Sequence, residues 1–152
     1  MEYTYDYSGR MKSLKTWRTY PNSGTATNTW NYDGYRGFLT NKTFADGKGP
    51  NYTYSPGGRF LTRTWARGIV TTYTNNNAGE VIGIGYSDGA TTNLVFGLDR
   101  LGKRTNIVDG AGTRILAYND AGLLLSETNS SGPFSGLTLS YSYDALLGAC
   151  RT

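Results

Sequence analysis

The side chains that most often carry chemistry are scarce in this chain of 152 residues. It contains no His, which excludes Ser-His-Asp and Cys-His catalysis within the chain, and also imidazole metal ligands. Its single Cys, Cys150, can form neither an intrachain disulfide nor a thiolate metal cluster. We therefore expect no metal or other cofactor.

Paired carboxylates are the acid–base chemistry that remains. Five acidic residues recur at or beside expected turns, where a side-chain oxygen can accept a hydrogen bond from a backbone N–H two residues on. This structural use is sufficient to explain them, so we predict that the chain is not an enzyme, and an enzyme with paired carboxylates is the least supported alternative. The five residues are Asp6, Asp33, Asp99, Asp120 and Asp144.

Aromatic side chains offer one further kind of chemistry, the stacking of rings on sugars. Exposed Trp17, Trp30 or Trp65 could form such a platform. However, Phe44, Trp65 and Tyr86 each lie seven residues after a glycine of the repeat described below, and Trp17 lies eight after one. We expect this column to pack on a sheet face between neighbouring repeats, with sugar stacking as the alternative.

These residues belong to a motif that recurs seven times, at a mean spacing of about 23 residues. Each copy has an aromatic or apolar pair flanking one residue, then a small polar residue, then a glycine. The copies begin "YTYDYSGRM", "WNYDGYRGFL", "YTYSPGGRFL", "YTNNNAGEVI", "FGLDRLGKR", "LAYNDAGLLL" and "YSYDALLGA". The third position holds Tyr5, Tyr32, Tyr54, Asn75, Leu98, Tyr118 and Tyr143. The polar residue and glycine of each copy are Asp6 and Gly9, Asp33 and Gly37, Ser55 and Gly58, Asn76 and Gly79, Asp99 and Gly102, Asn119 and Gly122, and Asp144 and Gly148.

The motif has the chemistry of a β-hairpin turn. Five copies read polar-x-x-Gly, which predicts a type I turn closed by a glycine in the left-handed region. The copies that end at Gly37 and Gly148 hold one more residue and predict longer turns. An alternating return strand follows each glycine, and most return strands end in a second turn signal such as "ADGKG" or "SDG". The sequence therefore predicts an all-β fold, a curved or spiral sheet of tandem antiparallel hairpins with about fourteen strands. We expect one array over residues 1–152, without a linker.

The motif "YTYDYSGR" resembles the repeat of the Rhs/YD-repeat family. That family includes bacterial Rhs toxins, the encapsulating components of insecticidal toxin complexes, and teneurins. The resemblance covers essentially the whole chain and is strongest at "YTYDYSGR", "YTYSPGGR" and "YSYDALLG". It implies a shell of β-hairpins that has no catalytic role and sequesters a C-terminal toxin, as part of a larger, exported bacterial protein. We therefore expect a shell segment that contacts neighbouring repeats or copies of itself through its sheet edges, near Tyr3–Tyr5 and Tyr141–Tyr143. The alternative is a carbohydrate-binding or adhesion module.

The charges argue against two other classes of partner. Fifteen Lys and Arg face eleven Asp and Glu, and no window holds the basic run that is typical of a nucleic-acid arm. No apolar run approaches membrane-spanning length, and the start "MEY" does not have the pattern of a signal peptide. We expect neither nucleic-acid binding nor membrane insertion.

Overall fold

A computed structural model describes residues 1–21, 23–144 and 150–151, and every regular element in these residues is a β-strand. The predicted fold class, all-β with tandem antiparallel hairpins, is confirmed. Among the described residues there is no helix of the length and hydropathy needed to cross a membrane. The strands are β1 (Glu2–Tyr5), β2 (Met11–Thr19), β3 (Ser23–Tyr32), β4 (Leu39–Thr43), β5 (Asn51–Tyr54), β6 (Phe60–Thr64), β7 (Val70–Asn75), β8 (Val81–Tyr86), β9 (Leu94–Leu98), β10 (Arg104–Asp109), β11 (Gly112–Tyr118), β12 (Leu124–Asn129), β13 (Thr138–Ser140), β14 (Ser142–Tyr143) and β15 (Cys150–Arg151).

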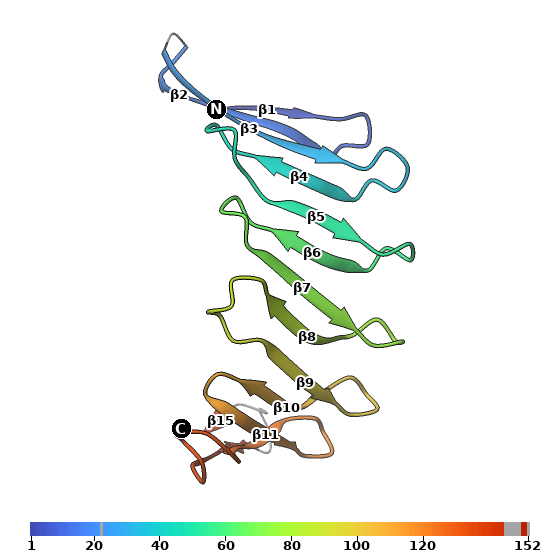
Figure 1. Ribbon diagram of the computed structural model, residues 1–152, viewed down its shortest axis with the longest axis vertical. Coiled ribbons are helices and arrows are strands. Elements are labelled where there is room, and N and C mark those ends of the chain that lie inside the picture. Colours follow the sequence, from blue (N-terminus) through green and yellow to red (C-terminus); the bar gives the residue numbers. More distant parts are fainter. Residues whose placement is uncertain (22, 145–149, 152) are drawn as a thin grey trace. The chain divides into compact units, whose positions relative to one another are not determined.

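The strands form two compact units, residues 1–72 and residues 73–152. In the first unit β1 to β6 and the start of β7 pair in chain order, each antiparallel to the next (Figure 1). In the second unit the end of β7 and β8 to β13 follow the same order, and β14 pairs with β15. Strands in chain order follow from short turns, because a tight turn brings each strand back beside the one before it. The expectation of a single array over residues 1–152 stays a prediction.

The register gives the sheet of residues 1–72 two different faces. Residues opposite each other in an antiparallel pair share a face, and the face alternates along each strand. One face, here called the polar face, carries Thr and Asn side chains; on it Asn31 donates to Asn41 at 3.0 Å, and Asn41 donates to Asn51 at 2.9 Å. The other, here called the aromatic face, carries most of the rings. Its members include Trp30, Tyr32, Lys42, Tyr52, Tyr54, Phe60 and Arg63.

Little of the described chain is deeply buried. The buried residues among those described are Phe96, with 7% of its surface exposed, Thr71, at 2%, and Pro50. The indole N–H of Trp65 donates to the hydroxyl of Thr71 at 2.8 Å, which satisfies this polar group. Contacts between neighbouring strands must therefore provide most of the stability, as in other repeat proteins.

The C-terminal edge of the sheet differs from the expectation. We expected the edge near Tyr141–Tyr143, but the last strand of the sheet is β13, which pairs with β12 and ends at Ser140. Tyr143 instead pairs with Cys150, in the two-stranded sheet of β14 and β15. The N-terminal edge is β1, as expected, and all four of its residues are exposed.

Candidate functional site: the contact between successive hairpins

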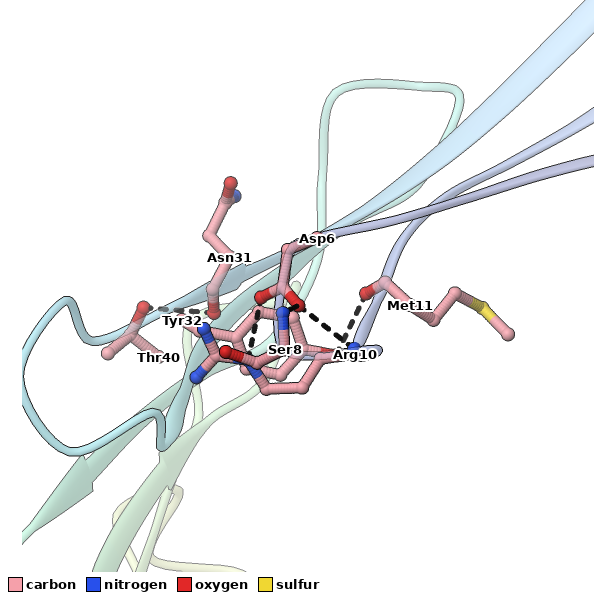
Figure 2. A network of polar contacts seen from close by, with 7 residues as sticks. All are labelled: Asp6, Ser8, Arg10, Met11, Asn31, Tyr32 and Thr40. Carbon is pink, nitrogen blue, oxygen red and sulfur yellow. Dashed lines mark hydrogen bonds and ion pairs between the residues drawn. The ribbon is translucent and has the colours of Figure 1, made fainter.

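The first turn shows how the motif residues are used (Figure 2). One carboxylate oxygen of Asp6 accepts hydrogen bonds from the backbone N–H groups of Ser8 and Arg10, both at 2.9 Å. The other oxygen pairs with Nε of Arg10 at 2.6 Å. These contacts, above all the bond from the Arg10 N–H, hold the pKa of Asp6 below its ordinary value, although desolvation opposes them.

The same pattern recurs in the other described turns. Asp33 accepts from the N–H groups of Tyr35 and Arg36, and the Arg36 bond is the main reason that its pKa is lowered. In each turn the glycine N–H donates to the carbonyl of the polar residue, and the glycine has a positive φ. The turn after Asp144, with Gly148, lies outside the described residues. The described turns run from Asp6 to Gly9, Asp33 to Gly37, Ser55 to Gly58, Asn76 to Gly79, Asp99 to Gly102 and Asn119 to Gly122.

The third-position tyrosine ties its hairpin to the preceding one. In three repeats its hydroxyl donates to a backbone carbonyl, and the acceptor is always the second residue after the preceding turn glycine. The bond from Tyr32 to Met11 is 2.8 Å long (Figure 2), and that from Tyr54 to Leu39 is 3.0 Å. The three pairs are Tyr32 with Met11, Tyr54 with Leu39 and Tyr143 with Leu124. Burial of Tyr54 raises the pKa of its hydroxyl, and the charge of the nearby Tyr52 raises it further by a smaller amount.

In three repeats the residue immediately after the turn glycine, here called the post-glycine residue, covers the ring of the next third-position tyrosine. The Arg10 guanidinium lies 4.7 Å from the centroid of the Tyr32 ring. Phe38 stacks on Tyr54 with centroids 4.8 Å apart. In the second unit the ammonium of Lys103 lies 5.7 Å from the Tyr118 ring. Successive hairpins therefore meet through a cation–π or aromatic contact, in addition to the strand ladder.

The post-glycine residue also explains why the next turn requires a glycine. A Cβ placed on Gly58 would lie 2.9 Å from Cζ of Phe38. A Cβ on Gly37 would collide with the guanidinium of Arg10 in the same way. The turn glycine thus has two functions, a positive φ and room for the side chain of the preceding hairpin. The same contacts join Glu80 to Gly102 and Lys103 to Gly122.

The expected aromatic column is distributed differently from what the spacing suggested. Phe44 and Trp65 lie one residue beyond β4 and β6, where each accepts a turn hydrogen bond from Gly47 or Gly68. Tyr86 ends β8. The residues at the other end of each hairpin are therefore turn residues as well as packing residues.

The three sugar-stacking candidates do not form one platform. The register places Trp17 on the polar face and Trp30 on the aromatic face, and Trp65 begins a turn. Each has a cation beside its ring: Lys15 at 5.3 Å, Lys42 at 4.8 Å and Arg63 at 3.5 Å, respectively.

Sequence reasoning singled out the tyrosine, the polar residue and the glycine, but it missed the post-glycine residue. The signal was present, because Arg or Lys follows the glycine at Arg10, Arg59 and Lys103. A side chain exposed in its own hairpin had no evident partner until the next hairpin was placed beside it. Among the described residues no three His, Cys, Asp or Glu side chains gather into a metal-binding group.

No protein-family model and no curated protein matches the chain. Solved structures do match. A pore structure of the Photorhabdus luminescens Tc holotoxin with a mutated TccC3 aligns with 93% of this chain, at a TM-score of 0.68 and 16% identity. The crystal structures of TcdB2-TccC3-TEV and TcdB2-TccC3 each align with 93% of this chain at a TM-score of 0.56, with 15% and 16% identity. The chain shares its fold with a segment of these Tc toxin chains. It spans only 8%, 10% and 11% of their lengths, respectively.

Proposed function

We propose that this chain is a non-enzymatic structural segment of an Rhs/YD-repeat shell that encloses a toxin or other C-terminal cargo. The observation that carries the proposal is the alignment of 93% of the chain with a segment of a Tc holotoxin chain. The contact between successive hairpins supports it, because the recurring residues form turns or join neighbouring hairpins.

The proposed role needs many hairpins. The chain spans about a tenth of the matched structures or less, so a closed shell requires further repeats. The hairpins that contain Arg10 and Phe38 each present to the next hairpin a post-glycine side chain and a carbonyl acceptor, and this arrangement can be extended along a longer array. The parent protein is exported as part of a toxin system in this proposal.

The test is to purify the protein that contains this chain from the cells that produce it, with an antibody against residues 1–152. Electron microscopy should then show a hollow particle, and limited proteolysis should leave an internal polypeptide intact until the particle is denatured. A solid particle, or an internal polypeptide that is cleaved as fast as it is in denaturant, contradicts the proposal.

The alternative function is carbohydrate binding or adhesion through exposed aromatic residues. It has less support, because Trp17 and Trp30 lie on opposite faces of the sheet. A polysaccharide pull-down separates the two functions: retention that is lost in Trp30→Ala or Trp65→Ala favours the glycan-binding module.

A further inference from the structure

The charges of the chain are distributed unevenly between its two units. Residues 1–72 contain ten Lys and Arg against four Asp and Glu, a net charge of +6, whereas residues 73–152 contain five against seven, a net charge of −2. None of the strands β2, β3, β4, β5, β6 and β7 contains an acidic residue. The strands of the first unit therefore form a basic surface. Its strand cations are Lys12, Lys15, Arg18, Lys42 and Arg63.

The acidic residues of the first unit are not positioned to neutralise the strand cations. Asp6, Asp33 and Asp46 lie in turns, where each carboxylate accepts a hydrogen bond from the backbone N–H of the second residue after it. Glu2 lies in the edge strand β1. Their carboxylates stabilise turns, so the sheet surface keeps its positive charge.

Two strand cations are held between aromatic rings on the aromatic face. The ammonium of Lys42 lies 4.8 Å from the ring centroids of both Trp30 and Phe44. The guanidinium of Arg63 lies 3.5 Å from the ring of Trp65 and 6.0 Å from that of Tyr52. The two clusters are repeat equivalents, because Lys42 is paired with Trp30 across β3 and β4 as Arg63 is with Tyr52 across β5 and β6.

Neither cation has an anionic partner. Within residues 1–21 and 23–144 no carboxylate forms an ion pair with Lys42 or Arg63, and Nε of Arg63 is buried without a hydrogen-bond acceptor. A partly desolvated cation is stabilised only in part by a ring, and a carboxylate at hydrogen-bond distance would stabilise it further. The chemistry of the two clusters thus fits an anionic ligand.

The spacing of the two cations indicates the form of that ligand. Lys42 and Arg63 lie on the same face, on strands two apart and offset by two residues along the strands, which places their Cα atoms about 12 Å apart. In an extended polyproline II chain every third residue faces the same side, at a rise of about 9 Å. Because the Lys42 and Arg63 side chains are long and can lean towards each other, an extended polypeptide with Asp or Glu at every third position can reach both cations.

We propose that the aromatic face of residues 1–72 binds extended, carboxylate-rich polypeptide, with acidic side chains on Lys42 and Arg63. The inference deepens the proposed function and rests on it, since such a polypeptide would be a segment of the enclosed cargo. Single-stranded nucleic acid fits less well, because base stacking requires open rings and the cations already cover a face of each ring.

The probe is fluorescently labelled poly-L-glutamate, titrated with the whole 152-residue chain and followed by anisotropy at low and at physiological salt. We expect saturable binding that weakens with salt. The double variant Lys42→Gln/Arg63→Gln should weaken binding at least tenfold. The matched control is Lys12→Gln/Lys15→Gln, which removes the same charge from β2, where the register places Lys15 on the polar face, and should weaken binding no more than threefold.

A conservative variant separates folding from binding. Lys42→Arg/Arg63→Lys keeps both charges and should bind within threefold of the unsubstituted chain. The proposal is overturned if poly-L-glutamate does not bind, if the two Gln variants weaken binding equally, or if oligo(dT) or alginate binds as tightly with the same dependence on Lys42 and Arg63. These outcomes are independent of whether the natural product forms a hollow particle, so the two proposals can fail separately.

Discussion

At the scale of single residues, the turn glycines are constrained by their neighbours as much as by their own backbone. Gly58 and Gly68 have nearly the same φ, +83° and +89°, and both close a hairpin turn. They differ in surroundings, because a Cβ on Gly58 meets the ring of Phe38 at 2.9 Å, whereas a Cβ on Gly68 meets nothing within 4 Å. Comparing substitutions at Gly58 and Gly68 therefore distinguishes the cost of backbone strain from the cost of disturbing the contact between hairpins.

We expect Gly58→Ala to lower the free energy of unfolding by more than Gly68→Ala. Both substitutions introduce left-handed strain of about 1–2 kcal/mol. Only Gly58→Ala also displaces Phe38, which adds about 1–3 kcal/mol, the range for overpacking. Urea unfolding of both variants measures the difference. Equal losses, or an unchanged difference when Phe38→Ala is added to both, would show that Phe38 does not constrain this turn.

A second prediction at this scale concerns the hydroxyl of the third-position tyrosine Tyr54. Tyr54→Phe removes the hydrogen bond to the Leu39 carbonyl and should lower the free energy of unfolding by about 1 kcal/mol at neutral pH. Because the folded-state pKa of Tyr54 is raised above its ordinary 10.0, its contribution is complete below pH 10 and is lost as pH rises through the folded-state pKa. The gap between the two proteins should therefore narrow in alkali. Tyr35→Phe is the control, since Tyr35 is fully exposed.

At the scale of the element, the turn aspartates make the stability of the hairpins depend on pH. The pKa values of Asp6 and Asp33 are lowered, so each favours folding above its ordinary pKa of 3.8, and this stability is lost as pH falls through the lower folded-state pKa. We expect the melting temperature to fall on acidification below about pH 4. Asp6→Asn/Asp33→Asn keeps an acceptor for the turn N–H groups but cannot titrate, and should flatten the acid limb. An unchanged acid limb would assign it to other carboxyl groups.

The hairpins themselves could be predicted from the sequence, because a turn is a local structure. Polar-x-x-Gly specifies its own hydrogen bonds and positive φ, whichever hairpin lies beside it. The contact between hairpins could be predicted only in part. The tyrosine was recognisable, but its acceptor carbonyl, Met11 for Tyr32, is defined only by the strand register. The cation clusters around Lys42 and Arg63 depend on that register too, so the scattered charges of the sequence did not reveal them.

At the scale of the whole molecule, each unit consists of antiparallel β-sheet with little deeply buried surface, and most strands contact the strands next to them in the chain. Such arrays have stabilities that add approximately from repeat to repeat. The terminal strands of such an array are sites for association, because the N–H and C=O groups on one side of each have no neighbour in the sheet.

The edge strands lead to the last prediction. In the 152-residue chain β1 and β13 pair on one side only, and their residues are exposed, including Tyr3 at 48% and Leu139 at 61%. Apart from Glu2, these strands lack the charged and Pro residues with which natural edge strands avoid pairing. We therefore expect the chain to self-associate edge to edge. Because the two edges differ, addition is head to tail and need not close.

Light scattering over a concentration series measures this association. Tyr3→Lys/Leu139→Lys places a charge on each edge and should shift the chain towards the monomer. Leu101→Lys is the control, because Leu101 is 81% exposed but lies in the turn between β9 and β10, so it should leave association unchanged. If the unsubstituted chain stays monomeric at high concentration, the edges are not available for pairing. If all three proteins associate equally, the contact lies elsewhere on the surface.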